Sequence, residues 1–186
     1  MSKNPEQTKK TLDQSPVTAK HVKRILTAEQ INGLLPAQLG QYLKDADQGN
    51  PYKYLEIAEM VEEKDAHYLS VMGTRKRAVS QLELKVDPRG EDKDTQKYTE
   101  FLQDWLDRDE LESETFNILD AIGKGFSATE IIWDRSGEYW VPRELKHRDP
   151  RLFIFGENME TLYLRGEDNE KIPLDPYKWI IHIHPA

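Results

Sequence analysis

The chain of 186 residues contains no cysteine. Disulfide bonds, cysteine-ligated zinc sites and thiol nucleophiles are therefore excluded. It also lacks an apolar run near the roughly 20 residues that a membrane-spanning helix requires. The first ten residues are polar and have no apolar stretch typical of a secretory signal. We expect a soluble protein that is intracellular when it is made.

Positive charge is scarce outside the amino terminus. The net charge is -8, yet residues 1–30 hold six Lys and Arg against three Asp and Glu. Residues 91–114 hold ten acids and three bases, a net charge of -7. Binding of duplex DNA requires clustered Lys and Arg to neutralise phosphates. The composition therefore argues against a sequence-specific DNA-binding protein.

Motifs that carry catalysis are also missing. Gly123-Lys124-Gly125 lacks the spacing of a phosphate-binding loop, and its glycines are better explained by a turn of the backbone. There is no Gly-x-Ser-x-Gly nucleophile motif. Carboxylates are abundant, but no pair stands out as general acid and base. We predict that the protein is not an enzyme and uses no cofactor.

Two histidines are the only residues that suggest a metal. His182 and His184 lie two apart in a predicted strand, so both side chains project from one face. A third ligand would have to come from His147, Asp149 or Asp175. Ordinary surface or interface histidines are the favoured interpretation, and a metal-dependent enzyme is the less favoured alternative.

The first half of the chain is predicted to be helical. Residues 1–26 are polar and aperiodic, which predicts a flexible arm, with docking on a neighbouring subunit as the alternative. Helical spacing of apolar residues follows, with Pro36 interrupting the first segment and Asp65 as a helix cap. The predicted helices cover residues 27–48, 51–64, 66–78, 95–106 and 111–123.

The second half is predicted to form strands. Alternating apolar residues predict a half-buried strand at 81–87. A turn at 135–138 separates two strand-like segments and indicates a β-hairpin. The predicted strands cover residues 126–134, 139–147, 152–155, 161–165 and 179–184. Helices followed by a small, mostly antiparallel sheet predict an α+β fold.

Aromatic residues gather at the predicted hairpin. Trp133, Tyr139 and Trp140 flank its turn. Packing across strands is the favoured interpretation, and a ligand platform is the alternative.

Five segments, taken in order, resemble one protein family. They are Leu34–Leu43 with Ala46–Pro51, then Ala58–Tyr68, Thr74–Val79, Leu119–Trp133 and His147–Phe153. Together they resemble the portal proteins of phage Mu and Mu-like prophages. The resemblance spans residues 34–153 and continues toward His184.

The resemblance implies a structural role. Portal proteins form a ring, usually of twelve copies, at one vertex of the virion capsid, and DNA enters and leaves through it. The implied partners are other copies of the chain, capsid and scaffold proteins, the terminase large subunit and tail connector proteins, with no membrane. Assembly would take place in the cytoplasm of the bacterial host. Family members are much longer, so this chain resembles their amino-terminal part, with residues 27–186 as a portal wing-like α+β domain.

Opposite charges on two predicted helices suggest how copies would meet. Acidic residues Glu56, Glu59 and Glu63 lie on one helix, and basic residues Arg75 and Arg77 lie on the next. The simplest interpretation of the bases is favourable placement near a helix carboxyl end. The alternative is that the acidic face of one subunit contacts the basic face of its neighbour in a ring. A non-catalytic protein-binding module of phage origin remains the alternative function.

Overall fold

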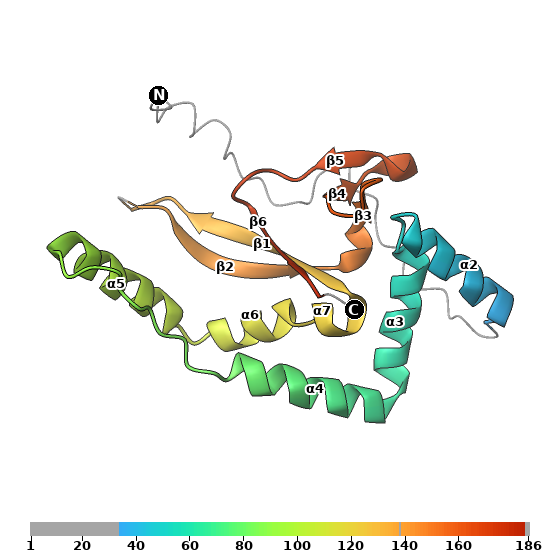
Figure 1. Ribbon diagram of the computed structural model, residues 1–186, viewed down its shortest axis with the longest axis horizontal. Coiled ribbons are helices and arrows are strands. Elements are labelled where there is room, and N and C mark those ends of the chain that lie inside the picture. Colours follow the sequence, from blue (N-terminus) through green and yellow to red (C-terminus); the bar gives the residue numbers. More distant parts are fainter. Residues whose placement is uncertain (1–33, 138, 185–186) are drawn as a thin grey trace.

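The amino-terminal half of the described chain is helical. The computed structural model describes residues 34–137 and 139–184. Helices α2, α3 and α4 follow one another around two corners, and α5 extends away from the rest (Figure 1). The helix bounds are α2 Pro36–Asp47, α3 Tyr52–Lys64, α4 Ala66–Ser80, α5 Lys93–Leu106, α6 Leu111–Ile118 and α7 Ala121–Lys124.

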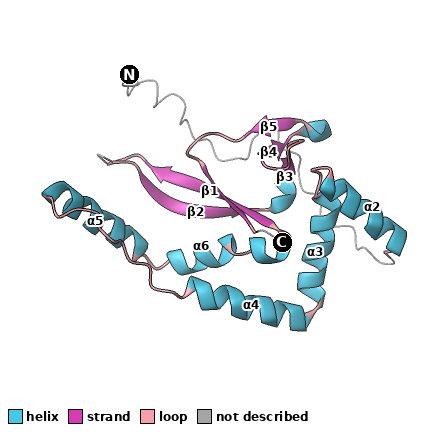
Figure 2. Cartoon of the chain, in the orientation of Figure 1, coloured by secondary structure: helices cyan, strands magenta, loops and turns pink. Residues whose placement is uncertain are grey.

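Two antiparallel three-stranded sheets make up the second half. Their strands are magenta in Figure 2. One sheet has the order β2-β1-β6, and the other has the order β3-β4-β5. The strand bounds are β1 Phe126–Asp134, β2 Val141–Arg148, β3 Phe153–Phe155, β4 Leu162–Arg165, β5 Lys171–Pro173 and β6 Trp179–Ile183, with short 3₁₀ turns at Pro150–Leu152 and Glu167–Asn169. Helices before antiparallel sheets confirm the predicted α+β fold.

The main hydrophobic core lies where α3 meets both sheets. Leu55 of α3 joins a cluster of buried residues from β1, β3 and β4. Two edge-to-face ring pairs tie the sheets together: Phe126 with Phe155 at 5.0 Å between centroids, and Phe153 with Trp179 at 5.4 Å. Such ring geometry adds to the stability supplied by burial alone. The core thus fixes α3 against the sheets.

Local sequence signals set several helix ends as predicted. The Asp65 side chain accepts hydrogen bonds from the backbone N–H groups of His67 and Tyr68, both at 3.0 Å, and so caps α4. Gly125 ends α7 with φ 84°, a conformation that glycine adopts without steric cost. The helix piece predicted to start near Pro36 does begin there, as α2.

The predicted strand at 81–87 is wrong. This segment connects α4 to α5 and pairs with no strand in the described chain. The side chain of Gln103 replaces a partner strand: its amide accepts a hydrogen bond from the Val86 N–H at 3.0 Å and donates one to the Leu84 carbonyl at 3.1 Å. One side chain from α5 thus forms the backbone hydrogen bonds that a partner strand would otherwise provide.

Two other elements differ from the prediction. The helix predicted at 111–123 is divided into α6 and α7, because the chain bends at Leu119 and Asp120. Strand β5 carries only three residues and was not predicted. The part of the first predicted helix before residue 34, like the predicted arm at 1–26, lies outside the described residues.

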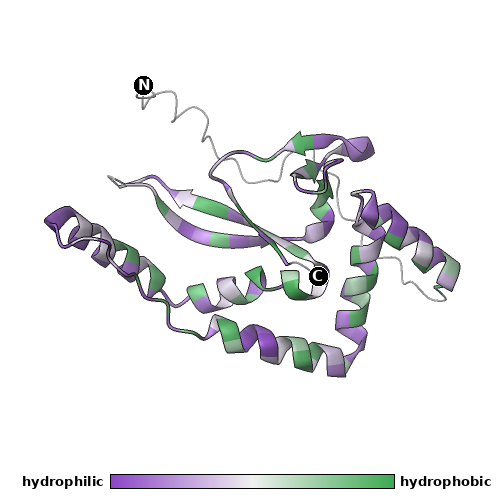
Figure 3. Cartoon of the chain, viewed as in Figure 1, coloured by the Kyte–Doolittle hydropathy of each residue, from purple (hydrophilic) through white to green (hydrophobic). Residues whose placement is uncertain are grey.

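Hydropathy varies along every helix, and hydrophobic residues occur on the outlying helices as well as in the sheets (Figure 3). Among the described residues, no helix combines the length and the apolar composition needed to cross a membrane.

Candidate subunit-contact surface

Of the acidic residues predicted as subunit contacts, some form ion pairs within their own chain and one is exposed. Glu56 is buried and accepts a hydrogen bond from Lys53 at 2.8 Å. Glu59 forms an ion pair with Lys124 of α7. Glu63 is exposed near the carboxyl end of α3. Two of the three acids therefore already have partners within their own chain.

The predicted basic residues are separated by helix geometry. Arg75 and Arg77 are exposed on α4, whereas Lys76 between them is buried. Successive helical residues point about 100° apart, so the three bases cannot share one face. Within residues 34–137 and 139–184, no ion pair joins Arg75 or Arg77 to the acids of α3. Both arginines remain open to a partner outside the chain.

A buried cluster of charges joins α3, α4 and α7, and the sequence did not reveal it. Asp120 accepts from Lys76 at 2.6 Å and lies 2.7 Å from Lys124. Glu62 lies 3.7 Å from Lys76 and 3.4 Å from Lys124. Burial alone would raise the pKa of Asp120, but hydrogen bonds from both lysines outweigh it and lower that pKa below its ordinary value.

Lys124 stays charged for the same reason. Burial favours the neutral amine, yet hydrogen bonds to Asp120 and Glu59 raise the pKa of Lys124 well above its ordinary value. The cluster connects residues 44 positions apart in sequence, Lys76 and Asp120. Its role in the structure is to orient three helices relative to one another, because each buried charge needs its partner in place.

His147 of β2 borders the charged cluster. Its Nε2 lies 4.0 Å from Asp120, which alone would favour the protonated ring. Burial opposes this and lowers the pKa of His147 below 6.5. The carboxylate of Asp120 is already neutralised by two lysines, so its effect on the imidazole is too small to compensate. The ring is therefore neutral near pH 7.

The central strand carries a second buried charge. Glu130 of β1 is fully buried and accepts from Arg148 Nε of β2 at 2.7 Å. Lys178, just before β6, lies 3.2 Å from the same carboxylate. One acid thus links all three strands of the sheet.

A buried arginine anchors the second sheet. The guanidinium of Arg165 donates to Asn50 Oδ1 at 2.7 Å, to Asn169 Oδ1 at 3.0 Å and to the Phe153 carbonyl at 3.2 Å. It also lies over the ring of Tyr52, 5.1 Å from the centroid. Burial lowers the pKa of Arg165. The arrangement holds the turn between α2 and α3 against β3 and β4.

The two histidines considered as metal ligands do not converge with the proposed third ligands. His182 Nδ1 lies 3.1 Å from the Ile118 carbonyl, and the rings of His182 and His184 pack edge to face at 6.2 Å. No group of three metal-binding side chains occurs in the part of the chain that the structure describes.

The aromatic residues of the hairpin pack against protein groups. The ring centroids of Trp133 and Trp140 lie 6.4 Å apart, and those of Tyr139 and Phe101 of α5 lie 6.2 Å apart. Trp133 donates from Nε1 to the Tyr177 carbonyl at 2.9 Å. Packing across elements, the favoured interpretation, accounts for these side chains.

Several apolar side chains of the outer helices are exposed. Helix α5 buries no residue, although Tyr98, Phe101 and Leu102 form an apolar stripe along it, exposed by 53%, 40% and 47%. Helix α2 also buries no residue and exposes Leu39 and Leu43. Apolar faces left uncovered on a folded protein mark sites of protein association.

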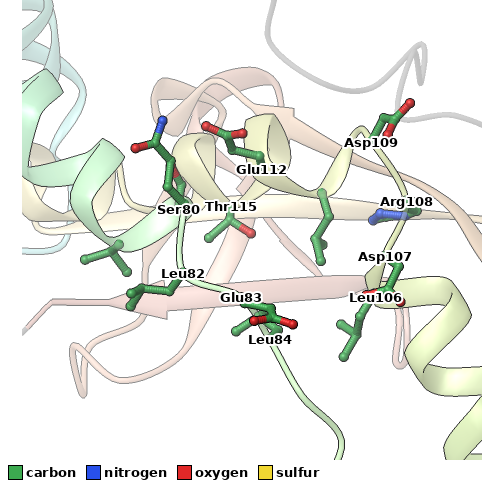
Figure 4. A pocket seen from close by; sticks show the side chains of 13 residues that line it. Ser80, Leu82, Glu83, Leu84, Leu106, Asp107, Arg108, Asp109, Glu112 and Thr115 are labelled. Atoms are coloured by element: carbon green, nitrogen blue, oxygen red, sulfur yellow. The ribbon is translucent and has the colours of Figure 1, made fainter.

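An open groove lies where α4, α5 and α6 approach one another (Figure 4). Its volume is about 390 Å³. Leu82 and Leu84 of the α4–α5 connection lie on one side, and Thr115 of α6 lies opposite. The groove is shallow and open, unlike an enclosed active site.

These features define a class of protein. Internal ion pairs fix an α+β scaffold, and its outer helices present apolar faces. That organisation is typical of a structural component of a larger assembly.

Comparison with known proteins gives the family. A match to the family described as the portal protein of Mu bacteriophage covers residues 55–186. The portal protein of Escherichia phage Mu is 35% identical over 159 residues, covering 81% of this chain and 30% of that protein. The Mu-like prophage FluMu protein gp29 of Haemophilus influenzae is 32% identical over 160 residues, covering 83% of this chain and 31% of that protein.

The chain belongs to the Mu portal protein family. This confirms the resemblance found in the sequence and the prediction of a structural protein that is not an enzyme. The chain spans about a third of the length of the curated relatives it matches.

Proposed function

We propose that the chain is part of the portal ring of a Mu-like phage or prophage, located at a capsid vertex, through which DNA is packaged and ejected. Membership of the Mu portal family and the uncovered apolar stripe of α5 support this proposal. In a ring, each subunit contacts its neighbour through two different surfaces that close by rotation. The partners would be further copies, capsid and scaffold proteins, the terminase and the tail connector.

Three of the five residues predicted to join copies remain as candidates. Glu56 and Glu59 have partners in their own chain, so Glu63, Arg75 and Arg77 are the members left to contact a neighbour. We expect reversal of Arg75 and Arg77 to glutamate to weaken ring assembly of a full-length portal protein carrying this region. Intact rings from that variant would overturn the proposed charge contact.

The test of the proposed function is the solution mass of the chain across a range of concentrations, measured by light scattering. Association that rises with concentration is expected, and Phe101→Ser with Leu102→Ser should reduce it by removing the α5 stripe. Tyr177→Ser is the matched control, because Tyr177 is an exposed aromatic residue outside α5.

A monomeric mass at every concentration would exclude ring contacts made by this region alone. Absence of rings in the full-length protein as well would overturn the proposed function.

A further inference from the structure

The groove between α4 and α6 combines an apolar floor with an acidic rim. Leu82 and Leu84 are exposed by 62% and 47%, values unusual for leucines that line a hollow. Leu106 and Leu111 extend the apolar surface from the neighbouring helices. A segment with apolar side chains would remove this surface from water.

The rim carries four acids and one base. The acids are Glu83, Asp107, Asp109 and Glu112. The base, Arg108, is already paired with Glu114 inside the chain. Asp109 and Glu112 have no ion-pair partner among residues 34–137 and 139–184, and Figure 4 shows both side chains at the mouth of the groove. The groove therefore favours a positively charged occupant.

One segment of this chain has the matching composition. Residues 17–26, which lie outside the described part, contain Lys20, Lys23 and Arg24 and no acid. Val17, Val22, Ile25 and Leu26 lie among these bases. We propose that residues 17–26 of a neighbouring copy dock in this groove, an inference that rests on the proposed ring. Their apolar side chains would lie on the leucines of the groove, and their bases would lie against its acidic rim.

The position of the groove favours a neighbouring copy over the same copy. The segment precedes α2 in sequence, and α2 lies on the opposite side of α3 from the groove (Figure 1). A contact within one copy would require the chain to return across α3. A contact between copies gives each subunit one donor segment and one acceptor groove, as a heterologous ring requires.

Site-directed cross-linking tests this directly, because the natural chain contains no cysteine. His21→Cys and Thr115→Cys are made in separate copies, mixed and treated with a short thiol cross-linker. The expected product is a linked pair with twice the mass of the chain. In the double variant, links between copies should form a ladder. Absence of the linked pair, or a link confined within one copy of the double variant, would overturn the proposal.

Charge exchange provides the specificity control. Asp109→Lys with Glu112→Lys should lower the cross-linking yield about tenfold, and Lys23→Glu with Arg24→Glu in the other copy should restore it. Glu157→Lys with Glu160→Lys is the matched control, since both acids are exposed far from the groove in sequence. A yield unchanged by Asp109→Lys with Glu112→Lys would exclude recognition by the rim.

The solution mass of the same samples distinguishes failure of arm docking from failure of the proposed ring. Association that persists without any cross-link would overturn arm docking and leave the proposed function intact. Loss of association in both the chain and the full-length protein would overturn the proposed function itself.

Discussion

At the scale of single residues, stability depends on buried charges whose partners come from distant parts of the sequence. Glu130 meets cations from β2 and from the segment before β6, and Asp120 meets a lysine of α4. Removing one member of such a set leaves a buried charge without compensation, which costs more than the pair contributes. These sets therefore specify how elements are arranged.

Glu130→Gln should strongly destabilise the fold. The amide keeps the shape of the side chain but leaves Arg148 and Lys178 beside a neutral group, and breaking a buried ion pair costs roughly 3–5 kcal/mol. Urea unfolding followed by circular dichroism measures the change. Glu144→Gln on the neighbouring strand is the control, because Glu144 is exposed. Equal stability of the two variants would contradict a structural role for the Glu130 charge.

His147 should make stability depend on pH. Its pKa is lowered in the folded state from 6.5, so the unfolded chain binds more protons as pH falls below that value. Folding stability is therefore full above about pH 6.5 and declines as pH falls from there through the folded pKa. Unfolding free energies measured from pH 7.5 to 4.5 should show this decline, and His147→Gln should flatten it.

Asp120 should affect folding stability in a lower pH range. Its folded pKa is also lowered, so its contribution is present above its ordinary pKa of 3.8 and is lost only as pH falls through the folded value. The His147→Gln variant should retain this acid-induced loss. A decline between pH 6.5 and 4.5 that is identical in both proteins would exclude His147 as its source.

At the scale of elements, the connection between α4 and α5 shows how one side chain substitutes for a strand. Residues 81–87 alternate in polarity, but no neighbouring strand is available and Gln103 satisfies the backbone. Gln103 also donates to Asp107 at 2.8 Å, which fixes its orientation. The connection and α5 are thereby held together although α5 buries no residue.

Gln103→Ala should release this connection. Loss of a hydrogen bond worth about 1 kcal/mol corresponds to roughly fivefold faster opening. Hydrogen exchange at the Val86 amide, measured by mass spectrometry of peptides, should accelerate by that factor or more. Gln96→Ala is the control, because the side chain of Gln96, also on α5, donates to the Glu91 carbonyl and not to Leu84 or Val86. Unchanged exchange at Val86 would show that other contacts hold the segment.

The sequence predicted elements where the signal was local, and failed where partners were distant. Asp65 and Gly125 act within a turn of their own helix ends, so caps and turns were readable. The bend at Asp120 was not, because it depends on lysines of α4 and α7. The acidic face of α3 was identified, but the sequence did not show that Glu59 turns inward to Lys124. The groove was missed because its walls come from three helices.

At the scale of the whole molecule, charge and apolar surface are distributed unevenly. The net charge is -8, with the acidic excess concentrated at 91–114 around α5 and the groove. Residues 1–30 hold six bases against three acids, an excess of positive charge at the other end of the sequence. This distribution supports the proposed contacts between oppositely charged regions of neighbouring copies, and the acidic excess opposes the approach of polyanions.

The net charge of -8 opposes the approach of DNA phosphates. The proposed passage of DNA of any sequence requires such weak binding. Anisotropy of a labelled duplex at about 150 mM salt should show affinity no tighter than the ~10⁻⁴ M of weak non-specific binding. Because few phosphate contacts form, lowering the salt should change the affinity little. Micromolar affinity with a steep salt dependence would contradict this, and it would place the bases of residues 17–26 on phosphates and not in the acidic groove.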